Sequence, residues 1–258
     1  MRKITCLAVM LVLATSSFAF AQNAASNKAF FASHPQGCAT VDPNQQGCIV
    51  LASFNGGPTT SEVTLFTIDQ ALKTSNGGAA SAILSMESVL WTFNTVTATN
   101  KEGRTSSSAR ATIKAWVEID GVPMKPAVLV SPGPKPPRVV EGVVYADRLQ
   151  ATGLDVNLAC TITVVGTTGT CAVTGDVTLD LFQATKNANS FVFFLGPLGP
   201  TIHSVKAVAV GSIECLDNSG ATMTCPQTTL TTFQTAGTLA AIGKASLLIE
   251  EQQNWGSQ

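Results

Sequence analysis

The clearest pattern in the chain is an unbroken alternation of apolar and polar positions between residues 109 and 119. The run reads ARATIKAWVEI, with Ala, Ile or Val at every odd-numbered position. A period of two over this length is typical of a β-strand with one buried and one exposed face. Asp120-Gly121 follows at once and suits the positive φ angles of a tight hairpin turn. The pattern therefore predicts a central strand that ends in a hairpin.

The segments on either side extend this prediction. Residues 100–108 are polar and lead back to an apolar segment at 89–98, which we interpret as a strand. Beyond the turn, residues 122–130 are apolar but contain Pro123 and Pro126. Because proline cannot donate a backbone hydrogen bond, we expect an irregular or edge strand there. The region predicts three consecutive antiparallel strands.

Short apolar or alternating segments recur along the rest of the chain, separated by turn residues. Residues 79–88 also suit a helix, but they run directly into 89–98 and we interpret them as strand. Residues 191–195, FVFFL, are wholly apolar, which predicts a strand buried on both faces. Thr, Ser, Val and Gly are frequent, and this composition favours strands and turns. The sequence predicts an all-β fold, an antiparallel β-sandwich for which the jelly roll is one candidate topology.

The first residues have the pattern of a secretion signal. Two basic residues precede a short apolar run, and Ala19-Phe20-Ala21 is a small-x-small cleavage motif. We therefore divide the chain into a signal peptide at 1–21, an N-terminal arm with a short disulfide loop at 22–58, and a β-sandwich domain at 59–258. We expect a secreted or periplasmic protein, cleaved after Ala21.

The cysteines support an oxidising location. Apart from Cys6 in the signal there are six, and they form three pairs that are close in sequence. The expected disulfides are Cys38–Cys48, Cys160–Cys171 and Cys215–Cys225. Six cysteines allow fifteen pairings, and local pairing, which clips individual hairpins, is the simplest. There is no Cys-x-x-Cys and the chain has 2 histidines, so we predict no metal site and no cofactor.

Charge narrows the choice of partners. Removing the two basic signal residues from 15 Lys+Arg leaves 13 against 16 Asp+Glu, a net charge of about −3. No basic patch suggests nucleic acid, and the mature chain has no apolar run long enough to be a transmembrane segment. A protein or glycan partner, or self-association, remains open.

A catalytic site is poorly supported. His34 and His203 are the histidines, and no Gly-x-Ser-x-Gly motif accompanies them. The carboxylate pairs Asp176/Asp180 and Glu250/Glu251 could serve a β-sandwich hydrolase, but their spacing is unspecific. The sequence favours a protein without enzymatic activity, and the paired-carboxylate hydrolase is an alternative.

Trp116 is the best candidate for ligand binding. It lies on the polar face of the central strand with Arg110 and Lys114, where an exposed indole ring could stack on a sugar. In the competing interpretation that face is covered and Trp116 fills the space beneath the cover. A carbohydrate-binding module is therefore the first alternative function.

The favoured hypothesis is a secreted, non-catalytic structural or interaction protein of the bacterial cell surface or periplasm. The low charge, the local disulfides and the lack of a catalytic set all point this way. If the protein self-associates, the apolar residues 29–31 and the proline-rich loop at 132–137 are the segments expected to dock.

Overall fold

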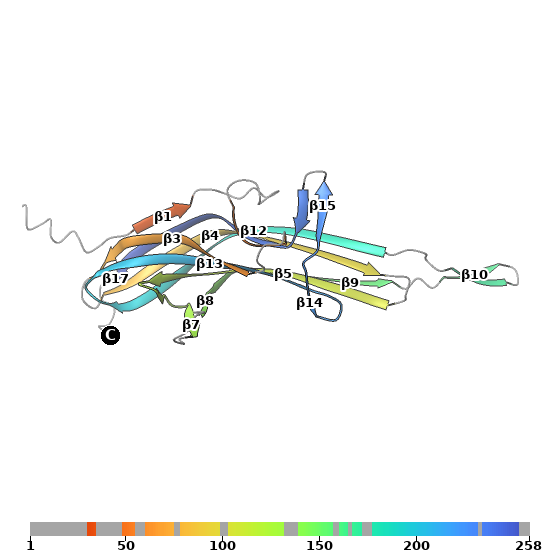
Figure 1. Ribbon diagram of the computed structural model, residues 1–258, viewed down its shortest axis with the longest axis horizontal. Helices are drawn as coiled ribbons and strands as arrows, with labels where there is room; N and C mark the ends of the chain where they lie inside the picture. Colours follow the sequence, from red (N-terminus) through yellow and green to blue (C-terminus); the bar gives the residue numbers. More distant parts are fainter. Residues whose placement is uncertain are drawn as a thin grey trace, which may run out of the picture.

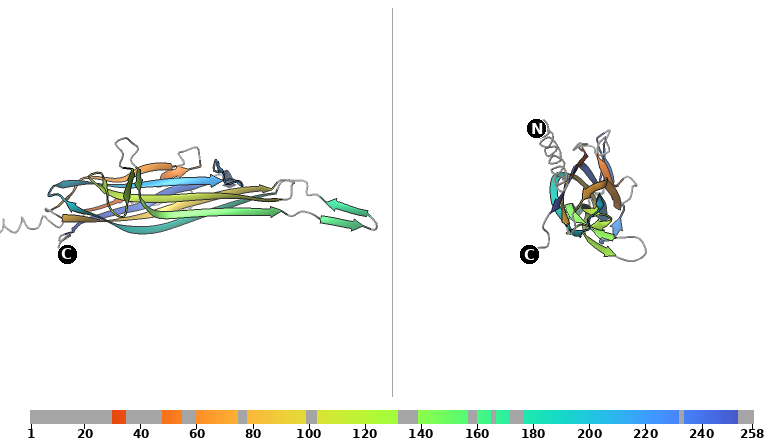
Figure 2. Two further views of the ribbon diagram at one scale, coloured as in Figure 1. Left: turned by 90° about the horizontal axis from the view of Figure 1, so that it is seen from below. Right: turned by 90° about the vertical axis from the view of Figure 1, so that its left-hand side faces the viewer.

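A computed structural model of the chain describes residues 30–34, 48–54, 60–74, 78–98, 103–131, 139–156, 160–164, 167–171, 177–231 and 234–252. All of the regular structure in these residues is β, and every pair of neighbouring strands is antiparallel. The molecule is long and narrow, because two sheets of long strands pack face to face (Figures 1 and 2). The predicted all-β, antiparallel sandwich is confirmed.

The first large sheet has five strands. Its order is β1 (Phe30–His34), β17 (Leu239–Gln252), β4 (Gly78–Ala98) and β12 (Val177–Leu198), and β2 (Ile49–Ser53) pairs with β17 beside β1. Both short strands fall in the segment predicted to be an N-terminal arm. Residues 29–31, considered as a docking segment, thus contribute their last two residues to a strand of the sheet.

The second large sheet has six strands. Its central strands are β13 (Ile202–Leu216) and β5 (Gly103–Ile119), flanked by β3 (Thr60–Lys73) on β13 and β9 (Val143–Val156) on β5. The short strands β14 (Thr222–Met223) and β6 (Val122–Pro123) complete it. The predicted hairpin turn is confirmed, since Asp120 and Gly121 have φ angles of 49° and 79°.

Three hairpins lie outside the two large sheets. They are β7 (Val128–Ser131) with β8 (Val139–Glu141), β10 (Cys160–Val164) with β11 (Thr167–Cys171), and β15 (Gln227–Thr231) with β16 (Gln234–Gly237). The β10–β11 hairpin extends beyond one end of the sandwich (Figures 1 and 2). The proline-rich residues 132–138 lie outside the described residues. No helix long and apolar enough to cross a bilayer occurs in the described part of the chain.

The connection between β4 and β5 differs from the predicted meander. The two strands are consecutive, but they belong to opposite sheets and face each other across the interior. The strands are also longer than predicted. The segments expected at 79–88 and 89–98 are one strand, β4, and those at 177–181 and 191–195 are both parts of β12.

The interior of the sandwich has two chemically different halves. In the apolar half, residues 80–86 of β4 belong to one cluster of buried side chains together with residues of β17 in the same sheet and of β5 and β13 in the opposite sheet. The fully buried members include Leu84, Ile113, Val117, Ala207 and Leu247. Tyr145 joins this half, where its hydroxyl donates a 2.7 Å hydrogen bond to the carbonyl oxygen of Leu84.

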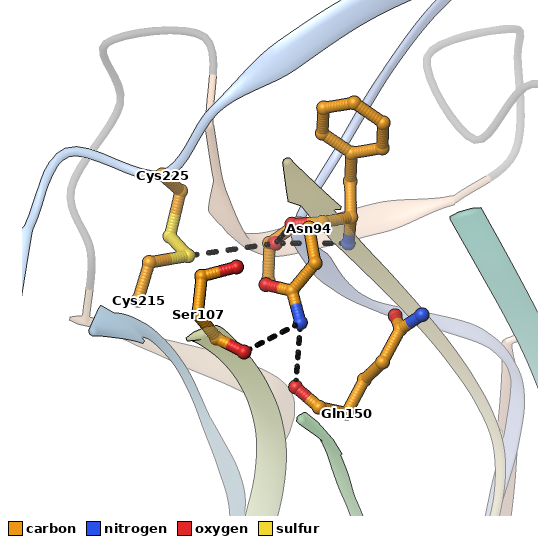
Figure 3. The surroundings of a disulfide bond; sticks show 7 residues. Asn94, Ser107, Gln150, Cys215 and Cys225 are labelled. Atoms are coloured by element: carbon orange, nitrogen blue, oxygen red, sulfur yellow. Dashed lines mark hydrogen bonds between the residues drawn. A yellow bond between two sulfur atoms is a disulfide. The ribbon is translucent and has the colours of Figure 1, made fainter. Parts of the chain in front are cut away.

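In the polar half, residues 88–96 of β4 place Ser88, Thr92 and Asn94 in the interior, all buried. The amide of Asn94 donates to the carbonyl oxygen of Gln150 on β9 at 2.7 Å and to that of Ser107 on β5 at 3.4 Å (Figure 3). The disulfide Cys215–Cys225 lies beside this network. Leu90 and Val96 are buried on the same face, so hydrogen bonds across the two sheets accompany apolar packing in this half.

Candidate interaction surface

The strand β12 forms one margin of the five-stranded sheet. It pairs with β4 along its whole length, from Val177 opposite Ala98 to Leu198 opposite Gly78. On its other side, the described residues provide one backbone partner: Lys125 exchanges two 2.8 Å hydrogen bonds with Phe194. No described strand pairs with this side between residues 178 and 188, which we name the open edge (Figure 1).

The direction of the backbone groups along the open edge follows from the contact at Phe194. Its N–H and C=O point away from β4, toward Lys125. Backbone groups alternate in direction along a strand, and the register with β4 is regular from residue 177 to 195. The N–H and C=O groups of the even-numbered residues from 178 to 188 therefore also point outward.

The side chains of these even-numbered residues lie on the outer face of the sheet. Asp180, Ala184 and Ala188 are exposed. Lys186 lies 2.9 Å from a carboxylate oxygen of Glu87 on β4. The open edge thus presents one carboxylate and one ammonium group six residues apart, with Phe182 and Ala184 between them.

The side of β12 that faces the second sheet is held by polar contacts. Arg148 on β9 donates hydrogen bonds to Gln183, to Thr185 and, at 3.2 Å, to the hydroxyl of Thr92. Farther along, the amide of Asn189 donates to the carbonyl oxygen of Tyr145 at 2.6 Å. These contacts fix β12 against the sandwich and leave its outer backbone groups uncovered.

The outer face continues from the open edge across the sheet. Four serines, Ser33, Ser246, Ser85 and Ser190, are aligned across β1, β17, β4 and β12 and line a shallow hollow of about 400 Å³. Next to this row, Ile83, Val192 and Phe194 are 37, 46 and 40% exposed. The prediction that 191–195 is buried on both faces is therefore wrong, because β12 is an edge strand of the sheet and one of its faces is exposed.

Trp116 does not belong to any exposed surface. It is 3% exposed, and its indole N–H donates a 2.7 Å hydrogen bond to Glu118, which is also buried. The prediction of an exposed Trp116 is wrong, because the backbone at Gly142 lies against the indole ring. Gly142 permits the close cover: a Cβ there would lie 2.8 Å from the indole ring.

Arg110 and Lys114 lie on the outer face of the same strand, where each has an acidic partner. Arg110 donates to both carboxylate oxygens of Asp147, at 2.9 and 2.5 Å, and Lys114 lies 2.5 Å from Glu141. The hydrogen bond from Arg110 lowers the pKa of Asp147, and the same contact raises the pKa of Arg110. The structure thus keeps these two cations on one face of β5 together with Trp116, but Trp116 is buried there and is not available to a ligand.

His203 lies in a cluster that resembles the geometry of a catalytic triad. Its Nδ1 is 2.6 Å from Asp120 Oδ2, and its Nε2 is 2.9 Å from the hydroxyl of Thr74. Thr74 is 3% exposed, and its hydroxyl donates to the carbonyl oxygen of Gly199 at 2.5 Å. A buried hydroxyl engaged in this way is not presented to a substrate, so the cluster ties the end of β3 to the β5–β6 turn and to β13.

The electrostatics of Asp120 fit this structural role. Burial raises its pKa, but hydrogen bonds from His203 and Ser204 outweigh that effect, and the net pKa is lowered from 3.8. Sequence reasoning missed the cluster because Asp120 and Thr74 are 83 and 129 residues away from His203. The Asp120-Gly121 turn was visible, but its contact with β13 was not.

The cysteine predictions are confirmed in one case. Cys215 and Cys225 form a disulfide. Cys48 is disulfide-bonded, but Cys38 lies outside the described residues, so that pairing stays a prediction. Cys160 and Cys171 are directly opposite in the β10–β11 register, which is compatible with the expected bond.

Of the two carboxylate pairs predicted for a hydrolase, the structure describes both members of one, Glu250 and Glu251. Glu250 and Glu251 are neighbours on β17, one exposed and the other buried, so they point to opposite faces. Asp176 and His34 belong to this part of the predictions too, but Asp176 and the side chain of His34 are not described. Among the described side chains, no group of three His, Cys, Asp or Glu residues is placed to hold a metal ion.

Comparisons with known proteins give no family. No family model matches the chain, and no curated protein matches it. Infectious Bursal Virus-derived T=1 particles align over 87% of this chain and 40% of theirs, with 9% identity and a TM-score of 0.15. Dimeric latent PorU from Porphyromonas gingivalis aligns over 87% of this chain and 20% of its own, with 9% identity and a TM-score of 0.16. The chain spans less than half the length of these proteins, and TM-scores this low support no inference about fold or function.

Proposed function

We propose that this chain is a secreted, non-catalytic interaction protein of the bacterial cell surface or periplasm, and that it binds its partner by β-strand addition at the open edge of β12. The signal-like N-terminus and the Cys215–Cys225 disulfide support an oxidising compartment outside the cytoplasm.

The observation that carries the proposal is the uncovered backbone between residues 178 and 188. An unpaired strand margin offers a row of N–H and C=O groups to which an extended segment of another chain can bond. Lys125 bonds to the outer side of β12 at Phe194, which lies outside the open edge. The charges of Asp180 and Lys186 oppose indiscriminate pairing and favour a partner of matching charge.

Residue-resolved hydrogen exchange of the oxidised chain 22–258 tests the proposal, at a concentration at which light scattering reports a monomer. The amides of Asp180, Phe182, Ala184 and Lys186 should exchange fast, while those of Leu181 and Gln183 should be protected by β4. The amide of Leu90 on β4, a residue that pairs with β12 on one side and β17 on the other, is the internal control. Protection of the even-numbered amides in the monomer would overturn the proposal, since the margin would then be covered within the chain.

A further inference from the structure

We infer that the partner strand is β12 of a second copy of this chain, paired antiparallel around a two-fold axis at Gln183. The inference rests on the proposed function and identifies its partner. A two-fold axis makes the same segment meet itself, which is the commonest arrangement in homo-oligomers. The five-stranded sheets of the two copies then form one continuous sheet.

Backbone geometry restricts the registers that two open edges can adopt. In an antiparallel pair, the residues that exchange both hydrogen bonds must each direct their N–H and C=O toward the partner. On the open edge these are the even-numbered residues, so even-numbered residues must lie opposite even-numbered ones. An axis at Gln183 meets this requirement, because it sets Phe182 of one copy opposite Ala184 of the other.

Charge selects among the registers that remain. With the axis at Gln183, Asp180 of each copy lies directly opposite Lys186 of the other, on the same outer face, so the pair occurs twice. An axis at Asp180 or at Lys186 sets like charges opposite each other, which is destabilising. An axis at Phe182 sets Asp180 opposite Ala184, and one at Ala184 sets it opposite Ala188, so neither forms an ion pair.

The side chains on the open edge allow this approach. Lys186 already lies 2.9 Å from Glu87, and in the dimer it would lie between that carboxylate and Asp180 of the second copy. Phe182 meets Ala184, and Thr178 meets Ala188, so a large or branched side chain is opposite a small one at each of these positions. Neighbouring strands in the joint sheet would lie about 4.8 Å apart.

A charge swap tests the register. The dissociation constant of the oxidised chain 22–258 is measured by sedimentation equilibrium, over a concentration series up to about 1 mM. Asp180→Lys should weaken the dimer about tenfold or more, because two attractive pairs become repulsive. Combining Asp180→Lys with Lys186→Asp should raise the affinity above that of Asp180→Lys alone, although a carboxylate at position 186 then lies near Glu87. Glu250→Lys is the matched control, a charge reversal at an exposed site on β17 of the same sheet, and it should leave the constant unchanged.

Cross-linking provides a second measurement that does not depend on charge. At the axis, the two Gln183 residues would form a non-hydrogen-bonded pair with Cα atoms about 4.5 Å apart, which suits a disulfide. Gln183→Cys should therefore cross-link readily under mild oxidation. Asn187→Cys is the control on the same strand, because residue 187 of one copy lies opposite Leu179 and the two new cysteines would be about 27 Å apart. Equal cross-linking of both variants would refute the register.

The outcomes separate the two proposals. If the even-numbered amides exchange fast and the chain stays monomeric up to about 1 mM, the open edge stands but the second copy is refuted as its partner. If those amides are protected in the monomer, the proposed function fails and this inference fails with it. If a dimer forms but neither Asp180→Lys nor its combination with Lys186→Asp changes the dissociation constant, this interface is refuted.

Discussion

The two halves of the sandwich interior are both buried, but one is filled by apolar side chains and the other also contains hydrogen-bonded polar side chains. The inward positions of β4 from 80 to 86 are Ala, Ala, Leu and Met, and they meet aliphatic side chains of the opposite sheet. From 88 to 96 the same face of the same strand carries the polar residues Ser88, Thr92 and Asn94 between the buried Leu90 and Val96. Thr92 accepts a hydrogen bond from Arg148, and Asn94 donates one to the Gln150 backbone. One strand thus passes from an apolar to a hydrogen-bonded interior.

The two halves differ in how strongly their stability depends on the precise geometry of their contacts. Apolar contacts are non-directional, and their stabilisation grows with the area removed from water. A buried amide stabilises only when its partner is in place, and it costs free energy when the partner is missing. Ser88 Oγ and Gln150 Oε1 are buried without a partner among the described residues, so the polar half is the less fully satisfied of the two.

The largest effect is expected in the apolar half. Leu84 is fully buried, so Leu84→Ala removes packed methyl groups and leaves a cavity. We expect the free energy of unfolding to fall by about 2–5 kcal/mol, measured by urea unfolding followed through tryptophan fluorescence. Leu149→Ala, at a side chain that is 65% exposed, is the control and should cost less than about 0.5 kcal/mol.

The disulfide beside the polar half should rank second. Cys215 and Cys225 are separated by 10 residues, so replacing both by alanine releases a short loop in the unfolded chain. A loss of about 2–3 kcal/mol is expected in the same urea assay. Thr222→Ala, at an exposed position inside that loop, should leave the midpoint unchanged. A double variant as stable as the parent would mean that the polar half does not rely on this link.

Asn94 tests the polar network itself. Asn94→Ala leaves the Gln150 carbonyl without its 2.7 Å donor, and we expect a loss of about 1–3 kcal/mol. Asn187→Ala replaces an exposed asparagine on β12 and is the control. If both substitutions had the same small effect, the hydrogen bonds of the polar half would contribute no net stability.

The smallest effect is expected from acid. The pKa values of Asp120 and Asp147 are lowered from 3.8 in the folded chain, so the unfolded chain binds protons first as the pH falls. Their contribution is present above that value and is lost as the pH falls through the folded pKa values. Both side chains are partly exposed, so about 1 kcal/mol or less is expected from each.

The same titration distinguishes the two interiors from the surface. The side chains of Thr92, Asn94 and Gln150 have no ionisable group, so their hydrogen bonds should not respond to acid. Asp120→Asn and Asp147→Asn should each remove part of the pH dependence of urea unfolding between about pH 7 and pH 3. If the dependence were unchanged in both variants, other carboxylates would have to account for it.

Patterns among neighbouring residues predicted the features that depend on neighbouring residues alone, namely the position of a strand and of a turn. The alternation at 109–119 gave the strand β5 and its buried odd-numbered face, and Asp120-Gly121 gave the turn. Periodicity carries no information about which sheet a strand joins, so β4 was placed beside β5 instead of opposite it. The cover over Trp116 likewise depends on Gly142, a residue 26 positions away with no local signal of its role.

The residues of the proposed interaction site were harder to predict for the same reason. The open edge is defined by the absence of a described neighbouring strand along residues 178–188. No sequence pattern within β12 distinguishes an edge strand from a central strand. The wholly apolar run at 191–195 even predicted a strand buried on both faces. The contact between Asp120 and His203 joins a turn to a strand 83 residues later, which only the folded chain reveals.

The position of β17 also determines the order in which the sandwich can assemble. This strand is bonded to β4 on one side and to β1 and β2 on the other, although it comes last among the strands. Until residues 239–252 have left the ribosome, the earlier strands of that sheet lack their common neighbour. Pairings this distant in sequence form slowly, because a long loop must close first. Strands β1 and β2 can therefore join the sheet only when the chain is almost fully synthesised, whereas β4 and β12 can pair before that.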